Sequence, residues 1–183
     1  MNKNNTILFA GGALLTFGAL ALVSRSKQIP EGIEAVSNFE KEKYLGKWYE
    51  IARFNYLFEK NLSQVTAEYS LNDDGTIKVV NRGFNTKKNK FEEAVGKAKF
   101  VKDEHIAQLK VSFFGPFYAG YNVIAVDHNY QNALVVGKNR EYMWLLSRQP
   151  QMPEELKNDY LKKAALEGFN TSDLVWTNQN NLN

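Results

Sequence analysis

The side chains that could carry out catalysis are few in this chain. It has no cysteine and only two histidines, which excludes a thiolate nucleophile, disulfides and cysteine-based metal sites. His105 and His128 both fall in predicted hairpin turns, and neither has a second ligand at helical or hairpin spacing. We therefore interpret the chain as a non-enzyme that holds neither a cofactor nor a metal.

Two other residues indicate a specific packing interaction. Gly46 stands two positions before Trp48, and Arg148 follows a second apolar strand near the other end of the chain. A glycine beside an indole lets the backbone bend sharply or take positive φ. A guanidinium stacked on an indole is a favourable cation–π pair when it is partly desolvated. We predict that Trp48 and Arg148 are partners.

Composition and charge limit the classes of function. A chain of 183 residues suits one domain with a leader or tail, and its formal net charge is only +3. Nucleic-acid binding needs a clustered basic face, so a nearly neutral chain is a poor candidate for it. Aromatic residues make up 13% of the sequence, which suits a β-rich core or an aromatic-lined cavity.

The N-terminus carries a membrane-type segment. Residues 6–23 form an uncharged, mostly apolar run with basic residues on both sides, and as a helix they would reach roughly 27 Å, close to the thickness of a bilayer core. We assign residues 1–27 to a hydrophobic leader or membrane anchor and 28–35 to a linker; cleavage and retention both stay open. Position 25 is Arg, where many bacterial envelope proteins carry a lipid-bearing cysteine, so lipidation there is chemically impossible.

The body of the chain alternates short apolar segments with turn residues, as a meander of strands does. The strongest turn is Asn72-Asp73-Asp74-Gly75, because Asp-Gly supplies the positive φ of tight hairpins. Short links without helical crossovers predict an all-β fold, an eight-stranded antiparallel up-and-down barrel, since closure removes exposed edges. A two-sheet sandwich, the alternative, would need longer connections. The expected strands cover residues 48–58, 65–71, 76–84, 91–101, 106–114, 117–127, 132–137 and 142–148.

The pattern changes after Pro150. Residues 153–167 are predicted to form a helix that packs on the outside of the barrel. Residues 174–176 would add a short final strand beside the first one. The barrel domain then covers residues 36–177, and residues 178–183 are predicted to be a disordered tail.

Three segments resemble the conserved regions of the lipocalin family, in particular the bacterial outer-membrane lipocalins and the apolipoprotein D-like group. The first is Gly46 to Arg53, the second Val126 to Tyr130, and the third Leu145 to Pro150. The resemblance implies a calyx with an apolar lumen, open at one end and closed at the other by a helical turn near residues 38–44. It also implies structural roles for Gly46, Trp48, Asp127, Tyr130 and Arg148.

Strand parity predicts which side chains face the lumen. Trp48 fixes the inner face of the first strand, and Glu50 and Phe54 share that face. By the same parity Tyr142 and Trp144 lie on the face of Arg148. An apolar cavity with tyrosine hydroxyls and one buried carboxylate would accept an acyl chain. The predicted lumen set is Glu50, Phe54, Phe58, Tyr69, Phe84, Phe113, Tyr121, Tyr142 and Trp144.

We therefore expect a protein that binds, stores or transports small hydrophobic ligands, such as fatty acids or lysophospholipids, for membrane maintenance. Its expected location is the bacterial cell envelope, anchored to a membrane by the N-terminal segment or exported to the periplasm or outer membrane. A homodimer is left open. Two alternative functions also stay open: an enzyme acting on a lipid-like substrate in the same calyx, and a membrane-tethered interaction module whose barrel is filled by side chains.

Overall fold

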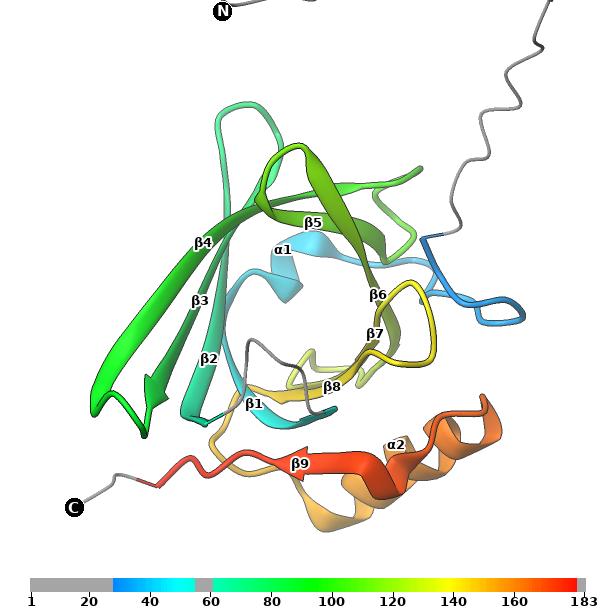
Figure 1. The fold of residues 1–183 in the computed structure, drawn as a ribbon. Helices are drawn as coiled ribbons and strands as arrows, with labels where there is room; N and C mark the ends of the chain where they lie inside the picture. Colours follow the sequence, from blue (N-terminus) through cyan, green and yellow to red (C-terminus); the bar gives the residue numbers. More distant parts are fainter. Residues whose placement is uncertain (1–27, 55–60, 181–183) are drawn as a thin grey trace, which may run out of the picture.

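Eight antiparallel strands close into a barrel in the computed structural model, which describes residues 28–54 and 61–180 (Figure 1). Each strand pairs with its neighbours in the sequence, and β1 pairs with both β8 and β2, which closes the sheet. This confirms the predicted fold class. The strands are β1 (Gly46–Phe54), β2 (Leu62–Leu71), β3 (Ile77–Asn85), β4 (Lys90–Phe100), β5 (Gln108–Phe114), β6 (Phe117–Val126), β7 (Asn132–Val136) and β8 (Met143–Ser147).

One helical segment lies inside the barrel at one of its ends, and another packs against its outer face. The single turn α1 (Lys41–Tyr44) lies across the inside of the barrel, whereas α2 (Glu154–Leu166) packs outside it (Figure 1). Tyr160 and Ala164 of α2 share a buried cluster with residues of β7 and β8. A short 3-10 turn, η1 (Thr171–Asp173), leads into β9 (Leu174–Trp176), which pairs with β1 as expected.

The antiparallel order gives the barrel two distinct ends. The closed end holds α1 and the turns β2–β3, β4–β5 and β6–β7, whereas the mouth holds the turns β3–β4, β5–β6 and β7–β8. Gly75 takes φ +75° in the β2–β3 turn, as its Asp-Gly sequence predicts. The predicted leader, Phe58 and residues 181–183 lie outside the described residues. Within the described part of the chain, no helix is long and apolar enough to cross a membrane.

A bulge in β1 changes which side chains face the lumen. Glu50 pairs with Leu146 and Ala52 with Leu145, so Ile51 is the extra residue. A one-residue insertion reverses the inside–outside alternation beyond it. Phe54 therefore packs against Phe169 in the cluster between the barrel and α2, and its predicted lumen position is wrong.

The seam between β1 and β2 is only half paired. The two strands pair over Gly46–Tyr49, and β9 takes the place of β2 along residues 52–54. The chain after β9 fills the remaining gap: Thr177 donates to the Ile51 carbonyl at 3.0 Å, and the Asn178 carbonyl accepts from Gln64 at 2.7 Å. The Gln179 amide donates to the carbonyls of Glu50 at 2.7 Å and Val65 at 2.9 Å.

This seam corrects the prediction of a disordered tail at its first residues. Asn178 and Gln179 are polar and follow the last strand, a pattern typical of a solvated terminus. They are ordered because they satisfy backbone groups that β1 and β2 leave unpaired where they separate, and such groups are costly to leave without partners.

The seam gives a first testable prediction. Replacing Gln179 with alanine removes two hydrogen bonds to backbone carbonyls, and we expect the free energy of unfolding to fall by about 1–2 kcal/mol. Urea denaturation measures the change. The matched control is Asn180→Ala, which truncates an exposed amide in the same segment. Equal stability of the two variants would show that the Gln179 amide does not hold the seam.

Candidate functional site

The barrel encloses a large cavity that opens at the mouth. Its volume is about 970 Å³, and its lining comes from β1 to β6, from β8 and from α1. Apolar wall residues include Val79, Leu109 and Leu146. Ligand pockets of roughly 300–1,000 Å³ with mostly apolar walls hold small molecules. The barrel is therefore hollow, unlike the filled barrel of the interaction-module alternative.

The floor of the cavity is built on Trp48. Its side chain is fully buried, and its indole N–H donates to the Tyr44 carbonyl at 2.8 Å. The guanidinium of Arg148 lies over the indole ring, 3.9 Å from its centroid, which is the pairing that the sequence predicts. Gly46 takes φ +90°, and a Cβ on it would lie 3.4 Å from Nη1 of Arg148. Any other residue would be strained at this positive φ, whereas the space beside the stacked guanidinium would just admit a Cβ.

Hydrogen bonds join the other two motif segments to this floor. Arg148 donates from Nη1 to the Lys47 carbonyl at 2.7 Å and from Nη2 to the Leu45 carbonyl at 2.8 Å. The Tyr130 hydroxyl accepts from the backbone N–H of Glu40 at 2.9 Å. Asp127 accepts two backbone N–H groups within its own turn, at 2.7 Å each. The five motif residues thus meet at the closed end, where the stacked Trp48 and its neighbours seal the barrel.

Three tyrosine hydroxyls form a cluster just above this floor. Tyr121 contacts Tyr44 at 2.6 Å and Tyr69 at 2.8 Å between hydroxyl oxygens. Burial raises the pKa of Tyr69 to about 12 and raises the pKa values of Tyr44 and Tyr121 well above their usual range. All three hydroxyls therefore stay protonated at neutral pH. Three protons serve two internal bonds, so the cluster keeps one hydrogen-bond donor for an acceptor in the cavity.

A buried ion pair lies in the wall of the mouth half. The bulge places Glu50 and Arg53 on the same inner face, and Nη1 of Arg53 donates to Oε1 of Glu50 at 2.5 Å. Both side chains are nearly inaccessible, at 3% and 5% for Arg53 and Glu50. The Thr177 hydroxyl also donates to Glu50, at 2.5 Å. Burial raises the pKa of Glu50, and the neighbouring guanidinium opposes that shift.

The structure brings six of the nine predicted lumen residues to the cavity wall. Phe84 is not among them, because it lies on the opposite face of β3 from Ile77 and Val79 and packs edge-on against Phe91, with 5.3 Å between ring centroids. Its predicted lumen position is wrong. Alternation shows which residues of a strand share a face, but it does not show which face is inside unless one residue of the strand is already placed. The six residues that line the cavity are Glu50, Tyr69, Phe113, Tyr121, Tyr142 and Trp144.

Sequence reasoning missed two polar members of the site. Strict alternation from Trp48 predicts that Arg53 faces outward, and only the bulge in β1 turns it inward. Tyr44 was assigned to the closing turn, without a role for its hydroxyl in the cavity. For Tyr44 the sequence does hold a signal, because an aromatic residue at the end of the turn that closes the barrel directs its ring into the barrel.

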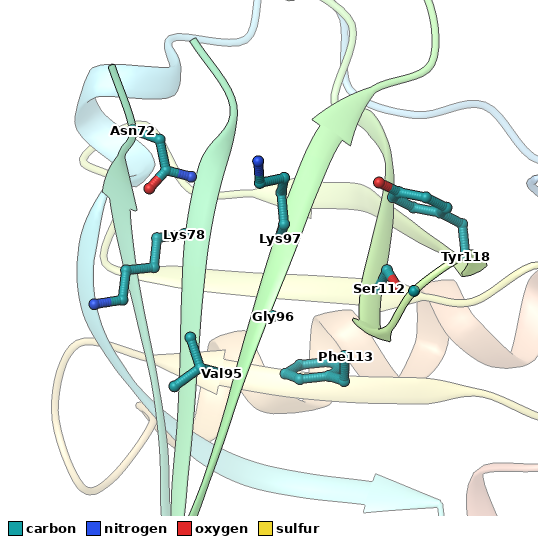
Figure 2. A pocket seen from close by; sticks show the side chains of 9 residues that line it. Asn72, Lys78, Val95, Gly96, Lys97, Ser112, Phe113 and Tyr118 are labelled. Atoms are coloured by element: carbon teal, nitrogen blue, oxygen red, sulfur yellow. The ribbon is translucent and has the colours of Figure 1, made fainter. Parts of the chain in front are cut away.

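A second pocket lies outside the barrel, where β4 and β5 separate (Figure 2). These strands pair only over Lys97–Phe100, and Phe113 lies beside Gly96 at the point of separation. The pocket has a volume of about 460 Å³ and is lined in part by Lys78 and Lys97. Lys97 pairs with Asp74 at 2.9 Å. We interpret the pocket as a surface groove between diverging strands.

The histidines and the acidic residues that could bind a metal ion lie as follows in the described part of the chain. Both histidines are exposed in closed-end turns, and neither lines the cavity. Among residues 28–54 and 61–180, no group of three or more histidines and acidic residues is placed to hold a metal ion.

An antiparallel barrel that is closed at one end and has a hollow, mostly apolar interior defines a calyx-type binding protein. The chain belongs to the lipocalin family: the model of the lipocalin-like domain matches residues 39–179. This confirms the family to which the motif segments point. Membership implies the binding of small hydrophobic ligands, and lipocalins are generally binding or transport proteins.

Relatives with related sequences come from bacteria, plants and animals. The chain is 48% identical over 167 residues to outer membrane lipoprotein Blc of Citrobacter freundii, which covers 91% of this chain and 94% of the relative. It is 40% identical over 156 residues to temperature-induced lipocalin-1 of Arabidopsis thaliana, covering 80% and 83%. It is 35% identical over 126 residues to apolipoprotein D of Rattus norvegicus, covering 64% and 65%.

Solved structures share the fold at low sequence identity. The cockroach allergen Per a 4 aligns with a TM-score of 0.66 at 19% identity, over 84% of this chain and 96% of its own. Insecticyanin from the tobacco hornworm also aligns with a TM-score of 0.66, at 17% identity, over 82% and 86%. At these identities the likeness concerns the fold alone.

Proposed function

We propose that this lipocalin binds fatty acids, lysophospholipids or similar amphiphiles in its calyx, and stores or transports them in the bacterial envelope for membrane maintenance. The observation that carries the proposal is the cavity of about 970 Å³, lined at its closed end by Phe39 and by Tyr44, which packs on Trp48, and open at the other end. Burying about sixteen methylenes at ~0.8 kcal/mol each offers more than 10 kcal/mol before ordering costs, which is ample for micromolar affinity.

The polar groups of the cavity favour amphiphiles over plain hydrocarbons. A ligand oxygen that reaches the floor would accept the remaining hydrogen bond of the tyrosine cluster formed by Tyr44, Tyr69 and Tyr121. At the wall of the mouth half, Glu50 and Arg53 satisfy each other, so a bound ligand need not supply a counter-charge there. The names of the bacterial relatives, outer membrane lipoproteins, support a location in the envelope.

We also propose that the function is non-catalytic. The tyrosine hydroxyls have raised pKa values, so they suit hydrogen-bond donation rather than proton abstraction at neutral pH. The exposed histidines lie at the closed end, away from the cavity lining. An enzyme acting on a lipid in the calyx would have to draw its general base from another group.

Photo-crosslinking in cells tests ligand binding on the full chain. Bacteria that express the protein are fed a photoreactive fatty acid or lysophospholipid, and crosslinked peptides are mapped by mass spectrometry. We expect crosslinks to wall residues such as Val79 and Leu109. The variant Ala67→Trp places an indole in the cavity and should reduce these crosslinks by roughly an order of magnitude, which corresponds to about 1.4 kcal/mol of lost binding free energy.

The matched control is Ala165→Trp, which adds the same side chain to the exposed face of α2 and should leave the crosslinks unchanged. Crosslinks confined to outer surfaces, or unaffected by Ala67→Trp, would contradict binding in the calyx. Recovery of a chemically converted lipid, lost when Tyr121 is replaced by phenylalanine, would favour the enzyme alternative.

A further inference from the structure

The turn between β5 and β6 presents two phenylalanines to solvent at the mouth. Phe114 and Phe117 are 81% and 78% exposed, and they face each other across the hairpin. At the closed end, the exposed large hydrophobic side chain among the described residues is Leu71, at 47%. A contiguous exposed apolar patch marks a surface that contacts a membrane or another protein.

The charges of the turns differ between the two ends. Mouth turns carry mainly basic residues, whereas closed-end turns carry mainly acidic ones. The mouth set is Lys87, Lys88, Lys138 and Arg140 against Glu141, and the closed-end set is Asp73, Asp74, Asp103, Glu104 and Asp127 against Lys102. Ion pairs with residues outside these turns engage one mouth cation, Lys88 with Glu92, and two closed-end acids, Asp74 with Lys97 and Glu104 with Lys41, so the contrast in sign is kept. Basic residues around an apolar tip are attracted to an anionic lipid surface within a Debye length, and acidic residues are repelled by it.

The chain joins the barrel at the same end. The Gln28 carbonyl accepts a hydrogen bond from Asn122 at 2.8 Å, and the same amide group donates to the Gly137 carbonyl at 3.1 Å, where the β7–β8 turn begins. Arg140 of that turn donates to the Glu31 carbonyl at 3.0 Å. The first residues of the predicted linker, 28–31, therefore pack beside the mouth. The apolar run of residues 6–23 precedes this point by only a few residues.

We propose that the mouth of the barrel docks on an anionic phospholipid surface, with Phe114 and Phe117 inserted at the interface and the basic turns on the headgroups. The described chain begins at Gln28 beside the mouth, so a membrane-inserted N-terminal segment would hold the mouth towards the bilayer. An amphiphile would then pass between the bilayer and the calyx without crossing open water. The docking itself does not depend on which ligand the calyx holds.

Depth-resolved quenching tests the orientation on the full chain. The chain has no cysteine, so Phe114→Cys and Leu71→Cys each give a single site for a fluorescent label. Both proteins are reconstituted into vesicles of phosphatidylethanolamine and phosphatidylglycerol that contain acyl-chain nitroxides, and only vesicle-bound protein recovered by flotation is measured. We expect the label at position 114 to be quenched several-fold more strongly than the label at position 71.

Each other outcome overturns the proposal. Equal quenching at the two positions, or stronger quenching at 71, would show that the barrel has another orientation on the vesicle. A chain that does not float with the vesicles would show that the protein does not bind them. A blue shift of the label at 114 without vesicles would mean that another protein copy covers the tip. Failure of docking would leave the crosslinks inside the calyx in place, whereas an empty calyx would leave the quenching in place, so the two proposals fail separately.

Discussion

Replacing Trp48 with alanine is expected to lower the free energy of unfolding by about 3–5 kcal/mol. The side chain is fully buried, and its loss removes the indole N–H bond to Tyr44 and the surface on which Arg148 stacks. Arg148 would keep its carbonyl partners, Lys47 and Leu45, but would lie over a cavity. Urea denaturation of wild type and variant measures the change.

Two further variants separate the contribution of the buried ring from that of the indole N–H and from that of an exposed indole. Trp48→Phe keeps a ring in the floor but not the N–H, and we expect it to lose clearly less stability than the alanine variant. Trp176→Ala removes an indole that is 50% exposed, and it should cost only about 1 kcal/mol because much of its surface already meets water. If Trp48→Ala cost no more than Trp176→Ala, the closed end of the barrel would not rest on Trp48.

Replacing Arg53 with methionine is expected to cost about 3–5 kcal/mol at neutral pH. The Glu50 carboxylate would then stay buried with the Thr177 hydroxyl as its remaining side-chain donor among the described residues. A buried charge without its counter-charge is costly, whereas an apolar pair of similar volume is tolerated. The double variant Arg53→Met/Glu50→Leu should therefore recover most of the loss.

The loss should also depend on pH in a defined direction. Burial raises the pKa of Glu50 above its ordinary value of 4.5, and removing the guanidinium of Arg53 raises it further. A carboxyl group with a raised folded-state pKa contributes stability below its unfolded pKa and loses it as pH rises through the folded value. We therefore expect the deficit of Arg53→Met to be largest at neutral pH and to shrink as pH falls towards 4.5.

The matched control for this pair is Arg82→Met. Arg82 lies on an exposed face of β3 with its guanidinium 4.1 Å from the centroid of the Phe91 ring, so the same change should cost less than about 1 kcal/mol and show little pH dependence. A deficit of Arg53→Met that stays constant between acid and neutral pH would contradict the assignment of the loss to Glu50.

Local sequence determined the barrel and its closed end. Turn residues such as Asp74-Gly75 stand at close spacing between apolar segments, and short links favour the pairing of strands that follow each other in the chain. The contact between Gly46, Trp48 and Arg148 was also predictable. A glycine next to an indole allows a sharp backbone bend, and a guanidinium stacks favourably on an indole. Their pairing follows from residue types rather than from the exact register of the strands.

The inner wall needed the tertiary structure, because a bulge leaves no mark in the residue pattern. Ile51 is an ordinary strand residue, yet as the extra residue of β1 it turns Phe54 out towards α2 and Arg53 in towards Glu50. Whether a strand bulges depends on the partner strand and on what the outer face must cover, and neither is local information. Sequence thus assigned the end of the barrel that is closed, and only the fold decided which charges lie inside it.

The seam and the mouth depend on the fold for the same reason. Gln179 is a polar residue near the end of the chain, and its order follows from two carbonyls, on Glu50 and Val65, that only the divergence of β1 and β2 leaves unpaired. Phe114 and Phe117 read as strand residues in the sequence, and only the hairpin between β5 and β6 exposes them beside the point where the N-terminal segment joins the mouth. The amino-acid sequence by itself determined the calyx and its floor, because these rest on local turns and on residue types. The tertiary structure decided the lining, the seam and the exposed aromatic tip of the mouth, because these rest on which distant backbone groups meet.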